Sequence, residues 1–426
     1  MARELSADFY RVVGVLIVAI GHWLVSAVTY DHGGFGNDYP LDVLPWTQWL
    51  TLVFQVVPVF FLVGGYSSAA SLTRRRADGG GATDWVRLRL GGILGPTTAY
   101  VVVVLAVVAV LSGVGVGRSP LSFGGWAVAM HLWFIPVYLV VLAMTPVAVC
   151  AHARWGLLVP AGLAVAVLAV DVVVRVAELP AVGLLNYVLC WAAVYQLGIC
   201  WRAGALRGRP ALALAAAAAV VVAVLLGLRW YPVSMVGAPG ADAQNNFPPN
   251  IALLAFATAQ AGLLAAAAPA VTRWLQRSRW RRPLAAANRD VMAVYLWQMV
   301  PVVIVALVGY PTGLLPQPVT GSLTWWLFRL VWLLILSVVL AAELALLWLG
   351  RSVFNRALPT IGSPLPGWCA PVLLAAGAVI AVLALGRFAV YGFAPDGRFP
   401  AGYAALYMAA MALLSLTAVR RARVSR

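Results

Sequence analysis

Long apolar runs recur along the whole chain and constrain its fold more than any other feature. About 20 apolar residues are the length that an α-helix needs to cross roughly 30 Å of hydrocarbon in a bilayer. Lipid offers backbone polar groups no hydrogen-bond partner, so each run is expected to be a helix that satisfies them internally. The sequence therefore predicts an all-α polytopic membrane protein with about twelve transmembrane helices. These runs lie at about residues 11–29, 46–70, 91–113, 126–150, 156–174, 186–201, 211–229, 250–270, 289–309, 323–349, 368–386 and 401–419.

Composition excludes a soluble fold. Of the 426 residues, 63% are hydrophobic and 10% are charged, and the mean hydropathy is +0.93. A soluble domain of this length cannot hide so much apolar surface. The first run is not followed by a small-residue cleavage site, so we expect a retained helix and not a removed signal peptide.

The charge distribution predicts how the chain is oriented. The net charge is +16, and all 29 basic residues are arginines. With the N-terminus inside, 23 arginines lie in or beside inner segments, Arg329 lies within a run, and five lie outside: Arg118, Arg175, Arg229, Arg387 and Arg398. The positive-inside rule produces such a bias. We therefore expect both termini in the cytoplasm, a multi-pass location in the inner (plasma) membrane, contacts with membrane lipids, and no nucleic-acid partner.

The first run carries an arginine and a histidine on one helix face. In "RVVGVLIVAIGHWL" the eleven-residue spacing places Arg11 and His22 about three turns, or roughly 16 Å, apart along the axis. Gly14 and Gly21 lie near the same stripe and predict a shallow groove between them. Polar residues at such depth usually face a cavity or a partner. The alternative is that His22 hydrogen-bonds to another helix and that the glycines allow close packing.

A second histidine lies near the outer end of the fourth run. "MHLWFIPVYL" contains His131, with Trp133 and Phe134 beside it. Twelve helices would bring His131 to a depth similar to that of His22, in the outer half of the membrane. Histidine is the side chain whose proton moves near neutral pH, so this pair predicts proton chemistry. An aromatic belt at the interface is the alternative explanation of the segment.

Five segments in order resemble the acyltransferase-3 family of integral membrane acyltransferases. They are Arg-x10-His in the first run, "VPVFFLVGGYSSA", "HLWFIP", "NYVLCWAAVYQLGICW" and "DVMAVYLWQMVP". The second segment includes Tyr66, which we place among the supporting site residues, and has Gly64 where the family usually has serine. The last has Gln298 where a histidine is common. The resemblance covers about residues 8–350, so we expect a ten-helix core at 1–350 and a two-helix extension with a basic tail at 351–426.

The resemblance implies acyl transfer from a cytoplasmic acyl-CoA, commonly acetyl-CoA, to a hydroxyl group outside the cytoplasm. The acceptor would be a sugar, a glycolipid or a glycosylated small molecule. No permanently bound cofactor and no metal are expected. His22 would act as general base or as a transient nucleophile, and Arg11 would position the donor. The donor phosphates could be held by charge-assisted bonds from Arg74, Arg75, Arg76, Arg87 and Arg89, although topology and lipid headgroups explain these arginines more simply.

The remaining candidates support this site. His131 could orient the acceptor or stabilise the oxyanion, and Trp133 could be a platform for a sugar. Gln298 can donate a hydrogen bond but cannot shuttle a proton. Glu343 is expected to pair with Arg11 or Arg89. Arg329 either contacts an anionic acceptor or snorkels to headgroups, and we favour snorkelling.

Other features leave alternatives open. The four cysteines, Cys150, Cys190, Cys200 and Cys369, have no metal or redox spacing. The segment "YDHGGFGNDYPLD" favours a solvated turn over a metal site, and "RWYPVSMVGAPGADAQNNFPPN" is expected to be an ordered cap or a mobile lid. A chain without lysine is typical of a GC-rich bacterial genome, in which family members modify the cell envelope. The alternative function is a proton-coupled transporter or a lipid or glycan flippase, with His22 and Glu343 as coupling groups. Oligomeric state is not predicted.

Overall fold

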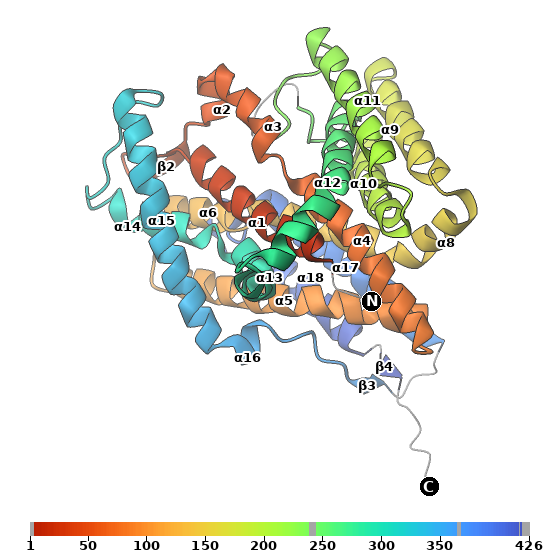
Figure 1. Cartoon of the computed structure of the whole chain (residues 1–426). Helices are drawn as coiled ribbons and strands as arrows, with labels where there is room; N and C mark the ends of the chain where they lie inside the picture. Colours follow the sequence, from red (N-terminus) through yellow and green to blue (C-terminus); the bar gives the residue numbers. More distant parts are fainter. Residues whose placement is uncertain (1–3, 238–243, 364–367, 417, 420–426) are drawn as a thin grey trace. The chain divides into compact units, whose positions relative to one another are not determined.

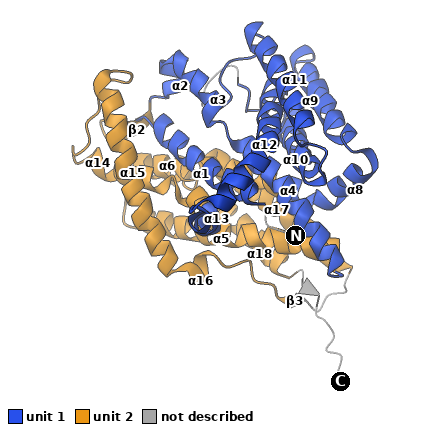
Figure 2. Ribbon diagram, viewed as in Figure 1, with its two compact units in different colours: residues 1–27, 38–79, 141–291 blue, residues 28–37, 80–140, 292–426 orange. Residues whose placement is uncertain are grey.

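The computed structural model describes residues 4–237, 244–363, 368–416 and 418–419 (Figure 1). Arg3, the four arginines of the C-terminal tail and residues 238–243 of the segment "RWYPVSMVGAPGADAQNNFPPN" lie outside this part of the chain. The described elements are helices with two small two-stranded sheets, and they form two compact units that interleave along the sequence (Figure 2). Unit 1 comprises residues 1–27, 38–79 and 141–291, and unit 2 comprises residues 28–37, 80–140 and 292–426.

The regular elements that the structure describes in unit 1 are helices. Its elements are α1 (Leu5–Val25), α2 (Pro40–Val43), the 3-10 helix η1 (Pro45–Leu50), α3 (Thr51–Phe54), α4 (Val57–Ala77), α8 (Thr145–Trp155), α9 (Leu158–Val176), η3 (Pro180–Leu185), α10 (Asn186–Ala203), α11 (Arg209–Gly227), α12 (Ile251–Arg277) and the first part of α13 (Arg281–Trp297).

Unit 2 contains both sheets. It comprises the antiparallel strands β1 (Val28–Asp31) and β2 (Gly34–Asn37), α5 (Ala82–Gly113), α6 (Arg118–Ala127), η2 (Met130–Trp133), most of α7 (Phe134–Ala143), the end of α13, α14 (Val300–Gly309), α15 (Leu323–Leu349), α16 (Arg351–Phe354), the parallel strands β3 (Gly362–Ser363) and β4 (Ala418–Val419), α17 (Cys369–Tyr391), η4 (Pro395–Gly397) and α18 (Ala401–Ser415).

The helices confirm the prediction of an all-α polytopic membrane protein. Within the described ranges, ten spans are long and apolar enough to cross a bilayer. An eleventh is the pair α13 and α14, which meet at an angle of 46°. The last predicted run forms α18, a shorter helix of 15 residues. Each predicted run overlaps one of these, but the count of twelve spans and the cytoplasmic position of both termini stay predictions.

Local chemistry fixes several helix ends. The Asn250 side chain accepts a hydrogen bond from the Leu253 backbone N–H at 3.1 Å and begins α12. Ser322 does the same for α15 through the Trp325 N–H, also at 3.1 Å. These caps satisfy backbone donors that a helix N-terminus leaves without a partner. At the other end of α10, Gly204 takes a left-handed conformation with φ of 91°, which ends the helix.

Two glycines let α4 and α10 cross at backbone contact in unit 1. A Cβ on Gly65 would lie 2.0 Å from the Tyr195 carbonyl oxygen, and a Cβ on Gly198 would lie 2.0 Å from the Leu62 carbonyl oxygen. Neither position therefore has room for a side chain. This crossing fixes the helix that carries Tyr66, Ser67 and the three arginines at its C-terminal end.

The C-terminal extension is an integral part of unit 2. Helix α17 packs against η2 and α6, and α18 packs against α17 and α5. The Phe393 N–H donates to the Gly125 carbonyl at 2.9 Å, while the Phe393 ring lies 6.2 Å from the Tyr100 ring. The predicted boundary at residue 350 separates the part of the chain that resembles the family from the part that does not. The division into compact units does not test that boundary.

A glycine on α5 lets a distant part of unit 2 approach this helix closely. A Cβ on Gly95 would lie 2.1 Å from the Arg356 carbonyl oxygen, and the Leu358 N–H donates to the Gly91 carbonyl at 2.9 Å. The chain after α16 therefore crosses α5 at backbone contact distance. A side chain at Gly95 would block this passage, whereas a Cβ on Gly91 would lie 3.8 Å from the Leu358 Cβ, an ordinary contact.

The segment "YDHGGFGNDYPLD" forms a hairpin followed by a short helix. Strands β1 and β2 pair in antiparallel register, with His32 and Gly33 at the turn in left-handed conformations of φ 45° and 84°. Phe35 of β2 stacks on Phe123 of α6 with ring centroids 5.0 Å apart. The solvated turn that the sequence favoured is therefore the tip of a hairpin.

Candidate functional site

Arg11 is held by oxygen atoms from three parts of unit 1. Its guanidinium donates to Asn288 Oδ1 and to Ser67 Oγ, both at 3.1 Å, and lies 3.5 Å from an Asp8 carboxylate oxygen. Asp8 is 7% exposed, so this ion pair is largely shielded from solvent. The three partners of Arg11 named here come from α1, α4 and α13. The arginine is therefore fixed in position, as a residue that orients a ligand must be.

A second acidic residue organises the polar groups beside Arg11. Glu4 accepts hydrogen bonds from Thr272 Oγ1 at 2.6 Å, Ser6 Oγ at 3.0 Å and the Tyr66 hydroxyl at 3.3 Å. The Tyr66 ring also lies 4.4 Å from the Trp201 ring. Tyr66 thus lies beside Glu4 at the N-terminal end of α1, and its supporting role in the site stays a prediction.

The predicted groove on α1 is occupied by aromatic rings. The Cβ position of Gly14 lies 3.2 Å from Phe60 Cζ, and that of Gly21 lies 3.1 Å from Phe54 Cδ1. The prediction of an open groove between Arg11 and His22 is therefore wrong. The glycines make room for side chains of α3 and α4, which sequence periodicity on α1 cannot reveal.

His22 lies near the C-terminal end of α1, half-buried, in the last turn of the helix. Its carbonyl oxygen accepts hydrogen bonds from the Ser26 N–H at 3.0 Å and the Ser26 hydroxyl at 2.7 Å, which closes the helix. Eleven helical residues keep the imidazole roughly 16 Å from Arg11 along the axis. The two side chains can therefore cooperate only through a long, thin ligand.

His131 is fixed inside unit 2. Its side chain is 2% exposed, and Nε2 lies 3.1 Å from the Leu296 carbonyl oxygen. A carbonyl only accepts, so the neutral ring carries its proton on Nε2 in this geometry. The Tyr295 hydroxyl donates to the His131 carbonyl, and the ring packs edge-on against Tyr100 and Tyr295. His22 and His131 belong to different units, so their matching depth stays a prediction.

Trp133 and Gln298, which the sequence grouped with His131 in the predicted site, differ in burial and in contacts. Trp133 is half-buried, with its ring perpendicular to Phe134 at 6.5 Å. Gln298 is fully buried at the bend between α13 and α14, and its Nε2 donates to the Tyr295 carbonyl at 3.3 Å. Gln298 therefore shares Tyr295 with His131, and its amide helps to satisfy the backbone where the helix breaks. The roles proposed for Trp133 and Gln298 in acceptor binding are not tested by these contacts.

Arg329 does not snorkel, which corrects the sequence prediction. It is 3% exposed, with its guanidinium carbon 4.8 Å from the Trp325 ring and 5.4 Å from the Trp332 ring. Aromatic faces attract a guanidinium and replace part of its lost hydration. Burial raises the pKa of nearby Tyr310, and the positive charge of Arg329 partly opposes that rise.

Glu343 is not paired with Arg89 in unit 2. Its Oε2 atom is buried and has no hydrogen-bond partner within the described residues. Arg89 instead places its guanidinium carbon 5.7 Å from the Trp85 ring. The pairing of Glu343 with Arg11 stays a prediction, because these residues belong to different units.

The arginines predicted to hold the donor fall into two groups. Arg74, Arg75 and Arg76 form the last turn of α4, where positive charge also stabilises the helix dipole. Arg87 bonds Asp84 one turn away on α5 at 3.2 Å, so part of its charge is already neutralised. The first group belongs to unit 1, while Arg87 and Arg89 belong to unit 2, and their joint action on one ligand stays a prediction.

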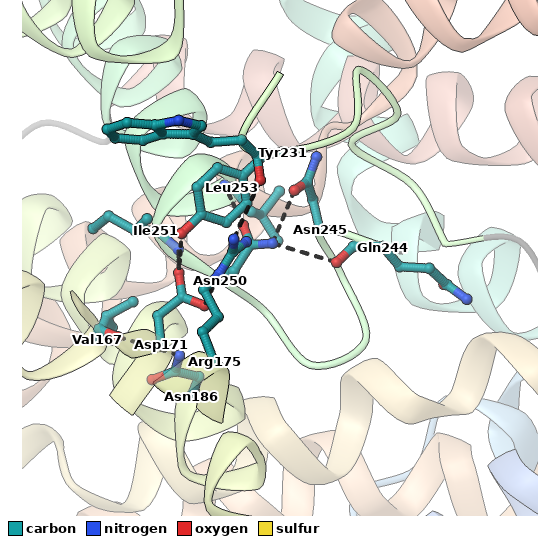
Figure 3. A network of polar contacts seen from close by, with 11 residues as sticks. Val167, Asp171, Arg175, Asn186, Tyr231, Gln244, Asn245, Asn250, Ile251 and Leu253 are labelled. Carbon is teal, nitrogen blue, oxygen red and sulfur yellow. Dashed lines mark hydrogen bonds and ion pairs between the residues drawn. The ribbon is translucent and has the colours of Figure 1, made fainter. Parts of the chain in front are cut away.

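A polar network joins the segment between α11 and α12 to α9 (Figure 3). The Tyr231 hydroxyl donates to Asp171 Oδ2 at 2.6 Å, and the Ile251 N–H donates to the same oxygen at 3.1 Å. Arg175 lies 3.6 Å from Asp171, four residues earlier on α9, and 4.0 Å from the Tyr231 ring, so the two charged residues form a local ion pair. Burial and the hydrogen bond to Asp171 raise the pKa of Tyr231.

Asparagines extend this network along the segment (Figure 3). Asn250 Nδ2 donates to Asn245 Oδ1 at 2.8 Å, and Asn245 Nδ2 donates to the carbonyls of Pro232 and Ser234 at 2.7 and 2.9 Å. Both asparagines are buried. The described parts of the segment therefore form the ordered cap that was one of the two expectations.

Sequence reasoning missed all three of the partners given above for Arg11. Asp8 could have been found, because residues three apart on a helix are neighbours. Ser67 and Asn288 are 56 and 277 positions away in sequence, and no local pattern points to them. Glu4 lies before the first apolar run, and no sequence pattern identified it as a site residue.

Comparisons with known proteins gave one match. A family model described as an acyltransferase domain of the acyltransferase-3 type matches residues 4–342. Neither a curated protein nor a solved structure matched the chain. The matched region begins with Glu4, includes the whole arrangement around Arg11 and ends inside α15, before α16, α17 and α18.

Proposed function

Because the chain belongs to the acyltransferase-3 family of membrane acyltransferases, we propose that it is an acyl-CoA-dependent O-acyltransferase. The donor is a cytoplasmic acyl-CoA, with acetyl-CoA as the expected one. The acceptor is a hydroxyl group of an extracytoplasmic sugar, glycolipid or glycosylated small molecule. The single observation that most favours this function is the fixation of Arg11, on the helix that also carries His22.

The donor's shape suits this helix. An acyl-CoA has an anionic nucleotide end and a long, thin arm that ends in the thioester. A guanidinium recognises phosphate or carbonyl oxygens through directed hydrogen bonds. A ligand anchored near Arg11 would have to extend roughly 16 Å along α1 to bring its thioester to His22. The arginine clusters at Arg74–Arg76 and at Arg87 and Arg89 are proposed to bind the phosphates.

His22 then accepts the proton of the acceptor hydroxyl. As the proton moves to the imidazole, the hydroxyl oxygen attacks the thioester carbonyl and forms a C–O bond. The C–S bond breaks, and the imidazolium returns the proton to the leaving thiolate, which gives the ester and free CoA. General-base help of this kind contributes typically ~10²–10⁴-fold. A transient acyl-His22 is the competing route, in which the imidazole nitrogen attacks first.

The residues of unit 2 are proposed to act on the acceptor. His131 would orient the hydroxyl or stabilise the oxyanion, and Trp133 would offer a face to a sugar ring. Gln298 would support these groups, and Arg329 would serve an anionic acceptor. Tyr66, which belongs to unit 1, is also proposed to support the site. A bacterial cell-envelope glycan at the plasma membrane fits this set of proposals.

The test is binding and hydrolysis of radiolabelled acetyl-CoA by the purified chain in lipid nanodiscs. We expect the wild type to bind the thioester and release acetate slowly. His22→Ala should bind but lose turnover at least ~10²-fold. Arg11→Ala should bind poorly. His32→Ala is the matched control, since this histidine is 95% exposed at a hairpin tip and should behave as the wild type.

The outcomes separate the two functions. If the wild type shows no affinity for the thioester beside an active control enzyme, acyl-CoA dependence is refuted and transport becomes the leading explanation of His22. If His22→Ala hydrolyses acetyl-CoA at the normal rate, the acyltransferase function stands, but His22 is neither its general base nor its nucleophile.

A further inference from the structure

The turn between α12 and α13 carries a dense group of exposed arginines, which we call the arginine corner. It comprises residues 273–282 of unit 1 and contains five of them: Arg273, Arg277, Arg279, Arg281 and Arg282. In the described part of the chain, no carboxylate lies within ion-pair distance of any of the five. Their positive charge is therefore not neutralised by the fold and attracts an anionic ligand.

Two exposed tryptophans lie among these arginines. Trp274 and Trp280 are 50% and 52% exposed, and the guanidinium carbon of Arg279 lies 5.7 Å from the Trp280 ring. The corner directly follows a helix of 27 residues that is long and apolar enough to cross a bilayer. Tryptophan and arginine side chains at such a position are typical of the headgroup level of a membrane. The anion available there is a phospholipid headgroup.

The backbone of the arginine corner is fixed. Leu275 and Leu284 are buried on its two sides. The Ser278 N–H donates to the Leu275 carbonyl at 3.3 Å, and the Ser278 hydroxyl oxygen accepts from the Trp280 N–H at 3.1 Å. The Leu284 N–H donates to the Trp280 carbonyl at 2.9 Å. The five guanidinium groups therefore extend from a defined turn and not from a loose loop.

The arginine corner also joins two of the contacts that surround Arg11. Thr272, directly before the corner on α12, donates to Glu4 at 2.6 Å. Asn288, after the corner on α13, accepts from Arg11 at 3.1 Å. A change in the angle between α12 and α13 would therefore move Asn288 relative to the rest of the arrangement around Arg11.

We propose that the arginine corner binds the headgroup of an anionic phospholipid, and that this lipid holds α12 and α13 in the arrangement that fixes Arg11. A phosphate accepts charge-assisted hydrogen bonds from guanidinium groups of both helices and offsets the repulsion between them. A zwitterionic headgroup fits less well, because its ammonium group opposes the arginines. Only the part of this inference that concerns Arg11 rests on the proposed function.

The first experiment measures lipid binding alone. The purified chain in detergent is titrated with an equimolar mixture of phosphatidylglycerol and phosphatidylcholine, and native mass spectrometry counts the bound lipids. Each arginine beside an anionic lipid is worth about fivefold in affinity, so Arg279→Gln with Arg282→Gln should weaken phosphatidylglycerol binding by at least about tenfold. Arg207→Gln with Arg209→Gln is the matched control, since it removes two other exposed arginines of unit 1 and should bind as the wild type.

The second experiment measures the link to Arg11. The affinity for radiolabelled acetyl-CoA is compared in nanodiscs of phosphatidylcholine alone and of phosphatidylcholine mixed with phosphatidylglycerol. Phosphatidylglycerol should raise the affinity of the wild type by at least about fivefold, a typical coupling between two sites. The variant with Arg279→Gln and Arg282→Gln should lose this dependence. A general effect of surface charge has the opposite sign, because an anionic membrane repels the anionic donor.

The results separate the parts of the inference. Preferential binding of phosphatidylglycerol that the corner variant loses and the control variant keeps supports the lipid site. Equal binding of both lipids, or an equal loss in both variants, overturns it. An acetyl-CoA affinity that does not rise with phosphatidylglycerol overturns the link to Arg11. A wild type that binds no acetyl-CoA in either membrane refutes the proposed function, whereas the lipid titration still decides the lipid site.

Discussion

The backbone contact between α4 and α10 gives the sharpest stability prediction. The perturbation is Gly65→Ala, which places a methyl group where the distance to the Tyr195 carbonyl oxygen would be 2.0 Å. Non-bonded heavy atoms prefer separations of about 3.5–4.0 Å, so the helices must move apart locally by more than about 1 Å. The obstacle is backbone and cannot rotate away, as a side chain could.

The magnitude combines two opposing effects. Overpacking a well-packed interior costs typically about 1–3 kcal/mol, and a backbone obstacle favours the upper end of that range. Alanine gains up to about 1 kcal/mol over glycine in a helix interior. We therefore expect Gly65→Ala to lower the free energy of unfolding by about 2 kcal/mol, and Gly198→Ala to act similarly because its obstacle, the Leu62 carbonyl, is also at 2.0 Å.

Reversible unfolding in detergent micelles, followed by circular dichroism, measures this loss. Gly162→Ala in α9 is the matched control, because nothing lies within 4 Å of its Cβ position, and it should be neutral or slightly stabilising. The double variant Gly65→Ala with Gly198→Ala should cost less than the sum of the single changes, because one separation of the helices relieves both contacts. The reasoning is refuted if Gly65→Ala is as stable as Gly162→Ala.

Two further predictions concern the cap and the extension. Tyr231→Phe should lower the free energy of unfolding by about 1.5–3 kcal/mol, since it deletes the hydroxyl that donates to the buried Asp171 carboxylate; denaturant titration measures this, and an unchanged midpoint would contradict it. Phe393→Ala should cost about 3–5 kcal/mol, because a fully buried ring is removed. The exposed Tyr391→Ala on the same helix end serves as its control in the same titration.

The extension illustrates what the sequence could not supply. Helices α17 and α18 were expected from apolarity, but their role was not. Phe393 packs beside Tyr100, whose ring lies 6.2 Å from His131. Contacts this distant in sequence depend on how helices pack, which hydropathy does not encode.

The polar groups around the candidate site show the same limit. The i,i+4 pair of Asp171 and Arg175 can be predicted from the sequence, because residues of one helix have fixed geometry. The bond of Tyr231 to Asp171 cannot be, although it joins the same carboxylate. The snorkelling expected of Arg329 was wrong because three aromatic rings of α15 enclose its guanidinium.

The sequence by itself determined that this chain lies in a membrane, the approximate position of each apolar helix, and the family. The physical reason is that a helix in lipid satisfies its own backbone, so length and apolarity suffice to place it. Only the tertiary structure decided which oxygen atoms hold Arg11 and which rings fill the stripe of Gly14 and Gly21. Those contacts join residues from separate helices, and packing between helices depends on side-chain shapes that are matched across the fold rather than along the chain.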